Sequence, residues 1–303
     1  MSWPLATSRD LFAWPPGLPN CTARPGVFSC RRTRTLTLSI QFDGDGDPYR
    51  RYSMMSSCIA QSNVMPSTAT IHQRVDALDW PRIEQDLDLY GCAVVPGLAT
   101  LQECDALAAL YSHDDLYRSR VVMARHGFGS GEYKYFDYPL PELIGALRTA
   151  IYPHLVPLAN RWNEVMHIGV RYPAKHADFI RRCHHAGQVR PTLLILQYGA
   201  GDYNCLHQDL YGEHVFPLQV AILLSAPGRD FTGGEFVMTE QRPRMQSRAE
   251  VVPLAKGDAV VFTVNSRPVQ GTRGPYRVRL RHGVSRLRSG QRHTLGIIFH
   301  DAL

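Results

Sequence analysis

The chain changes from a helical to a strand-like pattern at residues 192–209, which read TLLILQYGAGDYNCLHQD. The run from Thr192 to Tyr198 is short and mostly apolar, which predicts a buried β-strand. The Gly-Ala-Gly-Asp segment that follows predicts a turn. The stretch ends on His207-Gln208-Asp209, whose first and third side chains point the same way if the backbone is extended. This segment therefore predicts a β-fold that holds a metal site.

Strand-like segments separated by turn residues continue to the end of the chain. They lie at 215–224, 235–238, 250–254, 259–264, 277–282 and 294–300. Helical patterns come earlier, at 80–89, at 100–111 and between 141 and 183, with one short strand at 91–95. Thr100 followed by Glu103 is a capping box that opens the second helix. Helices followed by a run of short strands predict a mainly β fold with flanking helices.

We expect a single domain over residues 71–303, with 71–190 as mostly helical support and 191–303 as the β core. Residues 1–70 carry scattered Pro, Ser, Arg and Trp without a sustained period, which predicts disorder. Methionines at 54, 55 and 65 also permit a later start, which would make this segment a mis-annotated extension.

Composition narrows the class of protein. The content of 44% hydrophobic and 20% charged residues is ordinary for a globular protein. The longest strongly apolar run, 218–224, is far shorter than the ~20 residues of a membrane helix, and no secretory signal is expected. The seven cysteines form no C-x-x-C pair and are odd in number. This pattern predicts neither a zinc ribbon nor a disulfide framework, and a reduced, cytoplasmic setting is expected.

Charge is distributed unevenly along the chain. Residues 71–240 hold 14 Lys/Arg against 20 Asp/Glu, a balance of −6, whereas residues 241–292 hold 12 against 2, a balance of +10. A basic sector suggests an anionic partner, of which nucleic acid is one option. Alternatively, these arginines only cover the solvent face of a sheet.

The motif H-x-D occurs three times, at 113–115, 176–178 and 207–209. Residues i and i+2 point the same way on a strand but about 200° apart on a helix. Since the first two copies fall in helical patterns, they are expected on solvated faces. Only the copy at His207 and Asp209 can chelate an ion.

Two histidines and one carboxylate form the ligand set of non-haem Fe(II) oxygenases, so a second histidine should come from a later strand. His282 ends the strand-like segment 277–282, and Arg292 follows ten residues later at the start of the last strand. A guanidinium makes two parallel hydrogen bonds to a carboxylate, which makes Arg292 a natural anchor for a dicarboxylic co-substrate. The predicted metal ligands are His207, Asp209 and His282.

The order of an H-x-D motif, a later histidine and an arginine ten residues after it resembles the 2-oxoglutarate/Fe(II)-dependent oxygenase superfamily. The resemblance covers about residues 89–299. The resemblance implies a double-stranded β-helix core of the jelly-roll kind. It also implies Fe(II), 2-oxoglutarate and O2 as cofactor and co-substrates. The far carboxylate of 2-oxoglutarate would be held by Arg292, with Thr294 and Tyr198 as secondary contacts, although Tyr198 could equally be a core residue.

Residues 203–214 look closest to a bacterial AlkB-like family predicted to demethylate damaged DNA oxidatively. The implied reaction hydroxylates a C–H bond while 2-oxoglutarate becomes succinate. On an N-methyl group, hydroxylation ends in loss of formaldehyde. Aromatic residues in 132–136 could stack on a flipped base, although Tyr135 and Phe136 fit a plain core equally well.

Other substrates and roles remain open. The same fold hydroxylates amino acids, prolyl residues and small metabolites. A non-catalytic metal-binding β-barrel is a further alternative, which Arg292 disfavours because a storage site needs no such anchor. His293 should face away from the metal, and no ligand pattern includes His184, His185 or His214. Gln219 and Asn204 could line the pocket, but nothing in the sequence fixes their direction.

Alternation on a strand separates the arginines before His282 from the metal site. If His282 points inward, Arg277, Arg279 and Arg281 must point outward. They cannot line the pocket. They could hold phosphates of DNA only where the outer surface adjoins the pocket mouth.

Overall fold

The computed structural model describes residues 70–210 and 212–303. Apart from Thr70, the predictions made for residues 1–70 fall on residues outside this range. No helix in the described part of the chain is long and apolar enough to cross a membrane.

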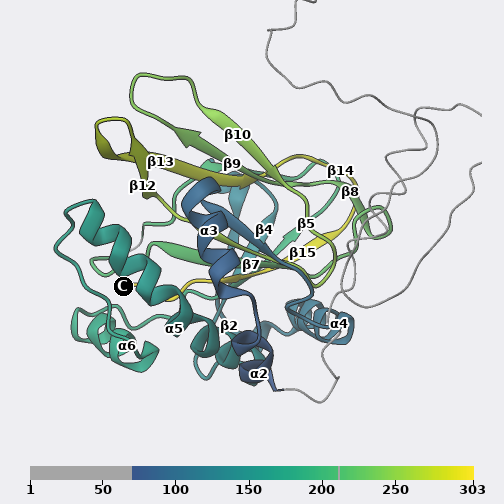
Figure 1. Cartoon of the computed structure of the whole chain (residues 1–303). Coiled ribbons are helices and arrows are strands. Elements are labelled where there is room, and N and C mark those ends of the chain that lie inside the picture. The colour runs from purple at the N-terminus through teal and green to yellow at the C-terminus, as the bar shows by residue number, and fades with distance from the viewer. Residues whose placement is uncertain (1–69, 211) are drawn as a thin grey trace, which may run out of the picture. The chain divides into compact units, whose positions relative to one another are not determined.

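Two antiparallel sheets form the centre of the fold (Figure 1). In sheet order, the larger has β1 (Cys92–Val95), β11 (Ala259–Thr263), β7 (Leu218–Leu223), β15 (Arg292–Ile297), β5 (Leu194–Tyr198), β4 (Glu132–Phe136) and β2 (Tyr117–Val122). The smaller has β10 (Arg248–Val252), β9 (Phe236–Gln241), β13 (Gly274–Val284), β6 (Tyr203–His207) and β3 (Gly129–Ser130), and β12 (Ser266–Gly271) pairs with β13. A separate ladder joins β14 (Leu287–Gly290) to β8 (Phe231–Gly233).

The chain crosses repeatedly between the two main sheets. It passes from β5 in the larger sheet to β6 in the smaller and back to β7, then through β9 and β10 of the smaller sheet to β11. It returns to the smaller sheet at β12 and β13 and ends in the larger sheet at β15. This alternation is a double-stranded β-helix, which confirms the predicted fold class.

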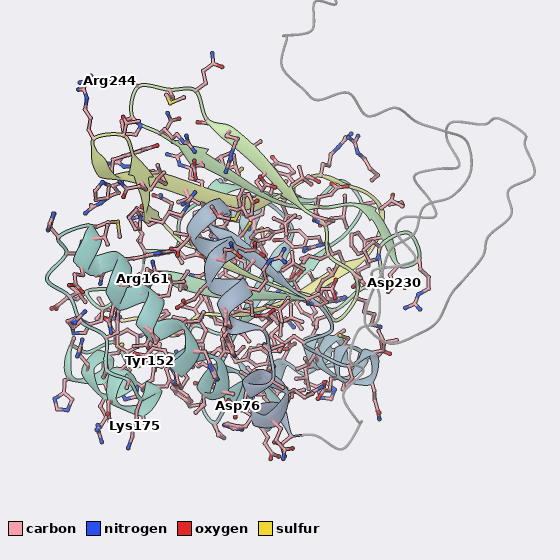
Figure 2. All side chains as sticks on the ribbon, viewed as in Figure 1. Asp76, Tyr152, Arg161, Lys175, Asp230 and Arg244 are labelled. Atoms are coloured by element: carbon pink, nitrogen blue, oxygen red, sulfur yellow. The ribbon has the colours of Figure 1, made fainter. Side chains whose placement is uncertain are left out.

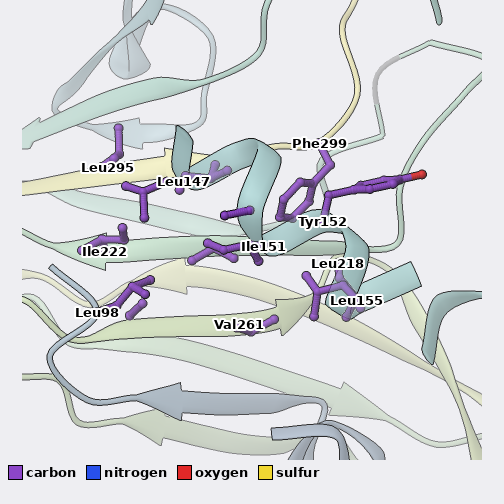
Figure 3. Close-up of a cluster of buried hydrophobic side chains, with 14 of the residues drawn as sticks. Leu98, Leu147, Ile151, Tyr152, Leu155, Leu218, Ile222, Val261, Leu295 and Phe299 are labelled. Atoms are coloured by element: carbon purple, nitrogen blue, oxygen red, sulfur yellow. The ribbon is translucent and has the colours of Figure 1, made fainter. Parts of the chain in front are cut away.

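Helices cover the larger sheet on the side away from the smaller one (Figure 1). They are α2 (Ile71–Asp76), α3 (Trp80–Tyr90), α4 (Leu101–Ala109), α5 (Glu142–Val165) and α6 (His176–His185), with short 3₁₀ turns at Leu110–Ser112, Asp114–Leu116 and Met123–Arg125. Figure 3 shows Leu147 and Ile151 of α5 against Ile222 and Leu295 of the sheet, all buried. The predicted capping box opens α4: the Thr100 hydroxyl accepts from the Glu103 backbone N–H.

The segment 71–190 contributes more to the sheets than expected. Helices predominate there, but β2 and β4 extend the larger sheet and β3 extends the smaller one. β6, which carries His207, was expected to be extended and pairs with β13. The helical support and the β core are therefore not separated at residue 190.

The expectation that the first two H-x-D copies are solvated is wrong for one histidine. His113 and its two acidic neighbours are exposed, but His176 is buried at the start of α6. Its ring packs against Tyr152 at 4.9 Å between centroids, and its Nε2 donates to the carbonyl of Phe299 at 2.8 Å. The partners come from distant segments, so the local pattern could not reveal the burial.

Two buried histidines should make stability sensitive to acid. Burial lowers the pKa of His176 and of His300 to about 4, so both are neutral in the folded protein at pH 7. An unfolded histidine titrates near 6.5. Their stabilising contribution is therefore complete above pH 6.5 and is lost as the pH falls from 6.5 towards 4.

The substitution His176→Gln keeps a hydrogen-bond donor for the Phe299 carbonyl but removes the titratable imidazole group. We expect the free energy of unfolding of the variant to fall less between pH 6.5 and 4, by roughly 3 kcal/mol, because the pKa of His176 is about 4 in the folded protein and near 6.5 in the unfolded chain. Urea unfolding at several pH values measures this difference. Parallel stability curves for the variant and the parent would contradict it.

Candidate metal centre

Pairing of β6 with β13 brings the two histidines of the predicted site together. His207 lies directly opposite His282 in the antiparallel register. A Cβ atom at Gly283 would lie 2.6 Å from the Asn204 carbonyl oxygen, so glycine at this position permits the close approach of the two strands. Asp209 follows the end of β6 and is buried, with 8% of its surface exposed.

The three side chains converge on one point. The Nε2 atom of His207 lies 3.4 Å from one carboxylate oxygen of Asp209, and Nε2 of His282 lies 3.3 Å from the other. The donor atoms of the three residues all lie within 4.8 Å of one another. Nδ1 of His207 contacts the Cys205 carbonyl at 2.8 Å. Because a carbonyl oxygen only accepts, Nδ1 is the donor there, and Nε2 is the ring nitrogen left to bind a metal ion.

The Asp209 carboxyl group is ionised at neutral pH. Burial alone would raise the pKa of the Asp209 carboxyl group, but the hydrogen bonds and charges of His207 and His282 outweigh it and hold that pKa well below its usual range. An ionised carboxylate flanked by two imidazoles is a donor set that suits a first-row divalent metal ion. The residues therefore fit the ion that the sequence predicts.

A cavity of about 360 Å³ extends from these three residues to Arg292. Arg292 lies on β15 opposite Tyr198 on β5, and both are fully buried. Its Nη1 atom donates to the Thr294 hydroxyl at 2.6 Å. Thr294 and Tyr198 also line the cavity, as do Gln219 and Asn204, whose direction the sequence left open.

The guanidinium of Arg292 lacks an acidic partner. Among the described residues no carboxylate lies within 4.0 Å of it, and its Nε atom has no hydrogen-bond partner. Burial lowers the pKa of Arg292 to about 10, so the group is still charged at pH 7. A buried charge without a partner is costly. The cavity is therefore built to receive an anion at this end.

Two tyrosines of the aromatic segment 132–136, which the sequence left open between base stacking and the core, line the cavity. Tyr133 and Tyr135 face the cavity with ring centroids 5.3 Å apart, whereas Phe136 lies in the core under the helices. The alternation along β4 would have placed both tyrosines on one face, had that strand been predicted.

The remaining histidines lie outside the cavity lining. His293 contacts Gln197 at 2.9 Å on the other face of β15, as alternation predicts. His184 and His185 are exposed and His214 is half-buried.

The middle residue of the H-x-D motif has a structural contact of its own. Nε2 of Gln208 donates to the Asn265 side-chain oxygen at 2.8 Å and to the Leu280 carbonyl at 2.7 Å. Leu280 precedes His282 by two residues on β13, so Gln208 ties the segment that carries Asp209 to the strand that carries His282.

Gln208→Ala is expected to weaken metal binding about tenfold, the lower end of what loss of an outer-shell partner costs. A titration with Co(II), monitored through the visible absorption of the bound ion, measures the affinity for the metal. The absorption spectrum also reports the geometry of the ligands. Gln270→Ala, an exposed glutamine on β12, is the matched control. Equal Co(II) affinity and equal spectra for both variants would show that Gln208 does not position the ligands.

A double-stranded β-helix with two histidines and one carboxylate at one end of its cavity defines a non-haem oxygenase. Residues 131–302 match the model of a family described as oxygenases catalysing oxidative methylation of damaged DNA. The chain belongs to this family.

Similar proteins are known in mycobacteria. The chain is 50% identical over 167 residues to the Mycobacterium tuberculosis proteins "Uncharacterized protein MT2286" (strain CDC 1551 / Oshkosh) and "Uncharacterized protein Rv2227" (strain ATCC 25618 / H37Rv), which covers 55% of this chain and 72% of each relative.

Solved structures also align with the chain at low identity. A prolyl-4-hydroxylase of Pseudomonas putida aligns with a TM-score of 0.44 and 14% identity, over 74% of this chain and 99% of that one. An oxidoreductase of the 2OG-Fe(II) oxygenase family from Burkholderia pseudomallei aligns with a TM-score of 0.44 and 16% identity, over 75% of this chain and 93% of that one.

Proposed function

We propose that the chain is an Fe(II)- and 2-oxoglutarate-dependent dioxygenase that oxidises an alkyl carbon on a damaged base of DNA. The observation that carries this proposal is the buried guanidinium of Arg292, which has no acidic partner among the described residues, in the same cavity as His207, Asp209 and His282. A site that only stored metal would need no buried cation beside it. The family description supports damaged DNA as the substrate class.

Five polar side chains of the cavity have a role in this proposal. His207, Asp209 and His282 would hold the iron. Arg292 binds the far carboxylate of 2-oxoglutarate through two parallel hydrogen bonds, and Thr294 orients the guanidinium. Bound iron would supply oxygen activation coupled to the decarboxylation of 2-oxoglutarate to succinate.

The apolar walls of the cavity exclude water from the reacting atoms. Leu196, Val220, Phe236 and Phe262, which lie on strands of the two sheets, line it. Water exclusion strengthens the ionic contacts of Arg292 and protects reactive species from side reactions. Tyr133 and Tyr135 form an aromatic wall that suits a planar base.

Turnover of iron-loaded protein is the deciding experiment. Succinate and formaldehyde release should be measured with N-methylated oligonucleotides, proline-rich peptides, free amino acids and no substrate. The proposal predicts succinate and formaldehyde together, and only with methylated DNA. Stimulation by peptides or amino acids alone would favour the alternative hydroxylase of a prolyl residue or small molecule. A cytoplasmic location remains a prediction.

A further inference from the structure

The outer face of β13 carries a row of arginines. Arg277, Arg279 and Arg281 are exposed and alternate with the buried residues Val278, Leu280 and His282. This confirms the outward direction predicted by alternation. The row therefore lies on the opposite face of the strand from the metal site.

No acidic group neutralises this row within the part of the chain that the structure describes. None of the three guanidinium groups lies within 4.0 Å of a carboxylate, and Arg277 contacts only a backbone carbonyl, that of Met166 at 3.2 Å. The residues opposite the row on neighbouring strands are neutral. They are Thr239, Gln241, Ser266 and Pro268.

The neutral surface continues on the next strand. Ala249 and Val251 of β10 pair with Thr239 and Val237 of β9 on the same face and are exposed. The turn between β9 and β10 adds exposed Arg244, which extends into solvent (Figure 2). The face around the arginine row is therefore basic or neutral, with the exposed Glu235 lying beyond the start of β9, and it favours a polyanion.

The row reaches the mouth of the cavity. His282 pairs with His207, so Arg281 lies next to Gln208, whose side chain contacts the Leu280 carbonyl. Leu206 and Gln208 flank His207 and also line the cavity. Leu206 is 43% exposed. The rim of the cavity thus continues into the arginine row.

Exposed aromatic rings stand on the other side of the same rim. Phe128 is 47% exposed and lines the cavity, and Tyr203 on β6 is 42% exposed. The ring of His126 stacks on Phe128 at 5.3 Å between centroids. Aromatic faces beside a basic track are the combination that binds single-stranded nucleic acid.

We propose that Arg277, Arg279 and Arg281 bind the phosphate backbone of single-stranded DNA that leads into the cavity between Leu206 and Phe128. This rests on the proposed function, because it takes DNA as the substrate. Alternate residues on a strand are about 6.6 Å apart, so the arginines form a linear track rather than one pocket. A single strand also presents its bases without the cost of flipping them from a duplex.

Salt dependence of binding tests the track. We expect that the triple variant Arg277→Gln, Arg279→Gln, Arg281→Gln binds a labelled methylated single-stranded oligonucleotide with a flatter slope of log K against log salt. The slope should change by ~0.7 per lost phosphate contact, about 2 in total. The matched control is Arg171→Gln, Arg181→Gln, Arg182→Gln, which removes equal charge around α6 and should keep the parent slope.

The outcomes separate this inference from the proposed function. Turnover of 2-oxoglutarate without DNA should be unchanged in both variants, because neither set of arginines lines the cavity. If the parent oxidises methylated DNA but the slope of the β13 variant equals that of the parent, the track is refuted while the function stands. Tighter parent binding to duplex than to single strand also refutes it. If the parent binds no DNA at low salt, the proposed substrate itself is wrong.

Discussion

Asp209→Ala is expected to abolish iron binding and to lower succinate formation by well over 100-fold. Even the loss of an outer-shell partner costs 10–100-fold in affinity or activity, and Asp209 would be a direct ligand. Its removal also leaves His207 and His282 without the charge between them. Anaerobic titration with Fe(II), together with succinate release at saturating 2-oxoglutarate, measures both effects.

Asp178→Ala is the matched control for this variant. It removes the aspartate from another copy of the H-x-D motif, at 176–178, which lies on a helix. Asp178 lies on α6 and forms an exposed ion pair with Arg181. We expect normal iron affinity and turnover for it. Tight iron binding by Asp209→Ala, or equal losses in both variants, would mean that the metal is held elsewhere.

The choice among the three H-x-D copies could be made from the sequence because it depends on one local property, the period of the backbone. The copy at 176–178 is on α6 and the copy at 207–209 follows β6. The inward direction of His282 and the outward direction of Arg279 follow from the same rule. The alternation on a strand therefore predicts which side chains face the metal site and which lie on the opposite face of the strand.

Strand β4 could not be predicted because a buried lysine interrupts its pattern. Lys134 is 6% exposed between the rings of Tyr111 and Tyr117, at 4.4 and 5.2 Å, and its ammonium binds the carboxylate of Asp114. These partners come from another segment and make burial of the charge possible. The local pattern therefore indicates a surface position for Lys134, and it does not predict the strand, although it does suggest that the aromatic residues of 132–136 stack on a base.

The contact of Gln208 is also invisible in the sequence. Its partners lie 57 and 72 positions along the chain, on Asn265 and Leu280. The motif predicts which residues hold the metal, but the tertiary structure decides what keeps them in position.

Arg292→Leu is expected to raise the KM for 2-oxoglutarate about 100-fold or more and to leave iron affinity unchanged. Hydrogen bonds to a charged group contribute about 1.5–3 kcal/mol each, and a bidentate carboxylate contact has two of them. Since the buried Arg292 has no acidic partner in the part of the chain that the structure describes, its removal leaves no other buried charge uncompensated there. The variant should therefore fold, and thermal unfolding checks this point.

Arg292→Lys sharpens this test. Lysine keeps the charge but cannot form two parallel hydrogen bonds, so its KM should fall between those of the parent and Arg292→Leu. Arg288→Gln, an exposed arginine on β14, is the control and should keep the parent KM. A KM for 2-oxoglutarate that is unchanged in Arg292→Leu would place the co-substrate elsewhere. It would also remove the observation on which the oxygenase mechanism rests, because the buried guanidinium would then have no anion to bind.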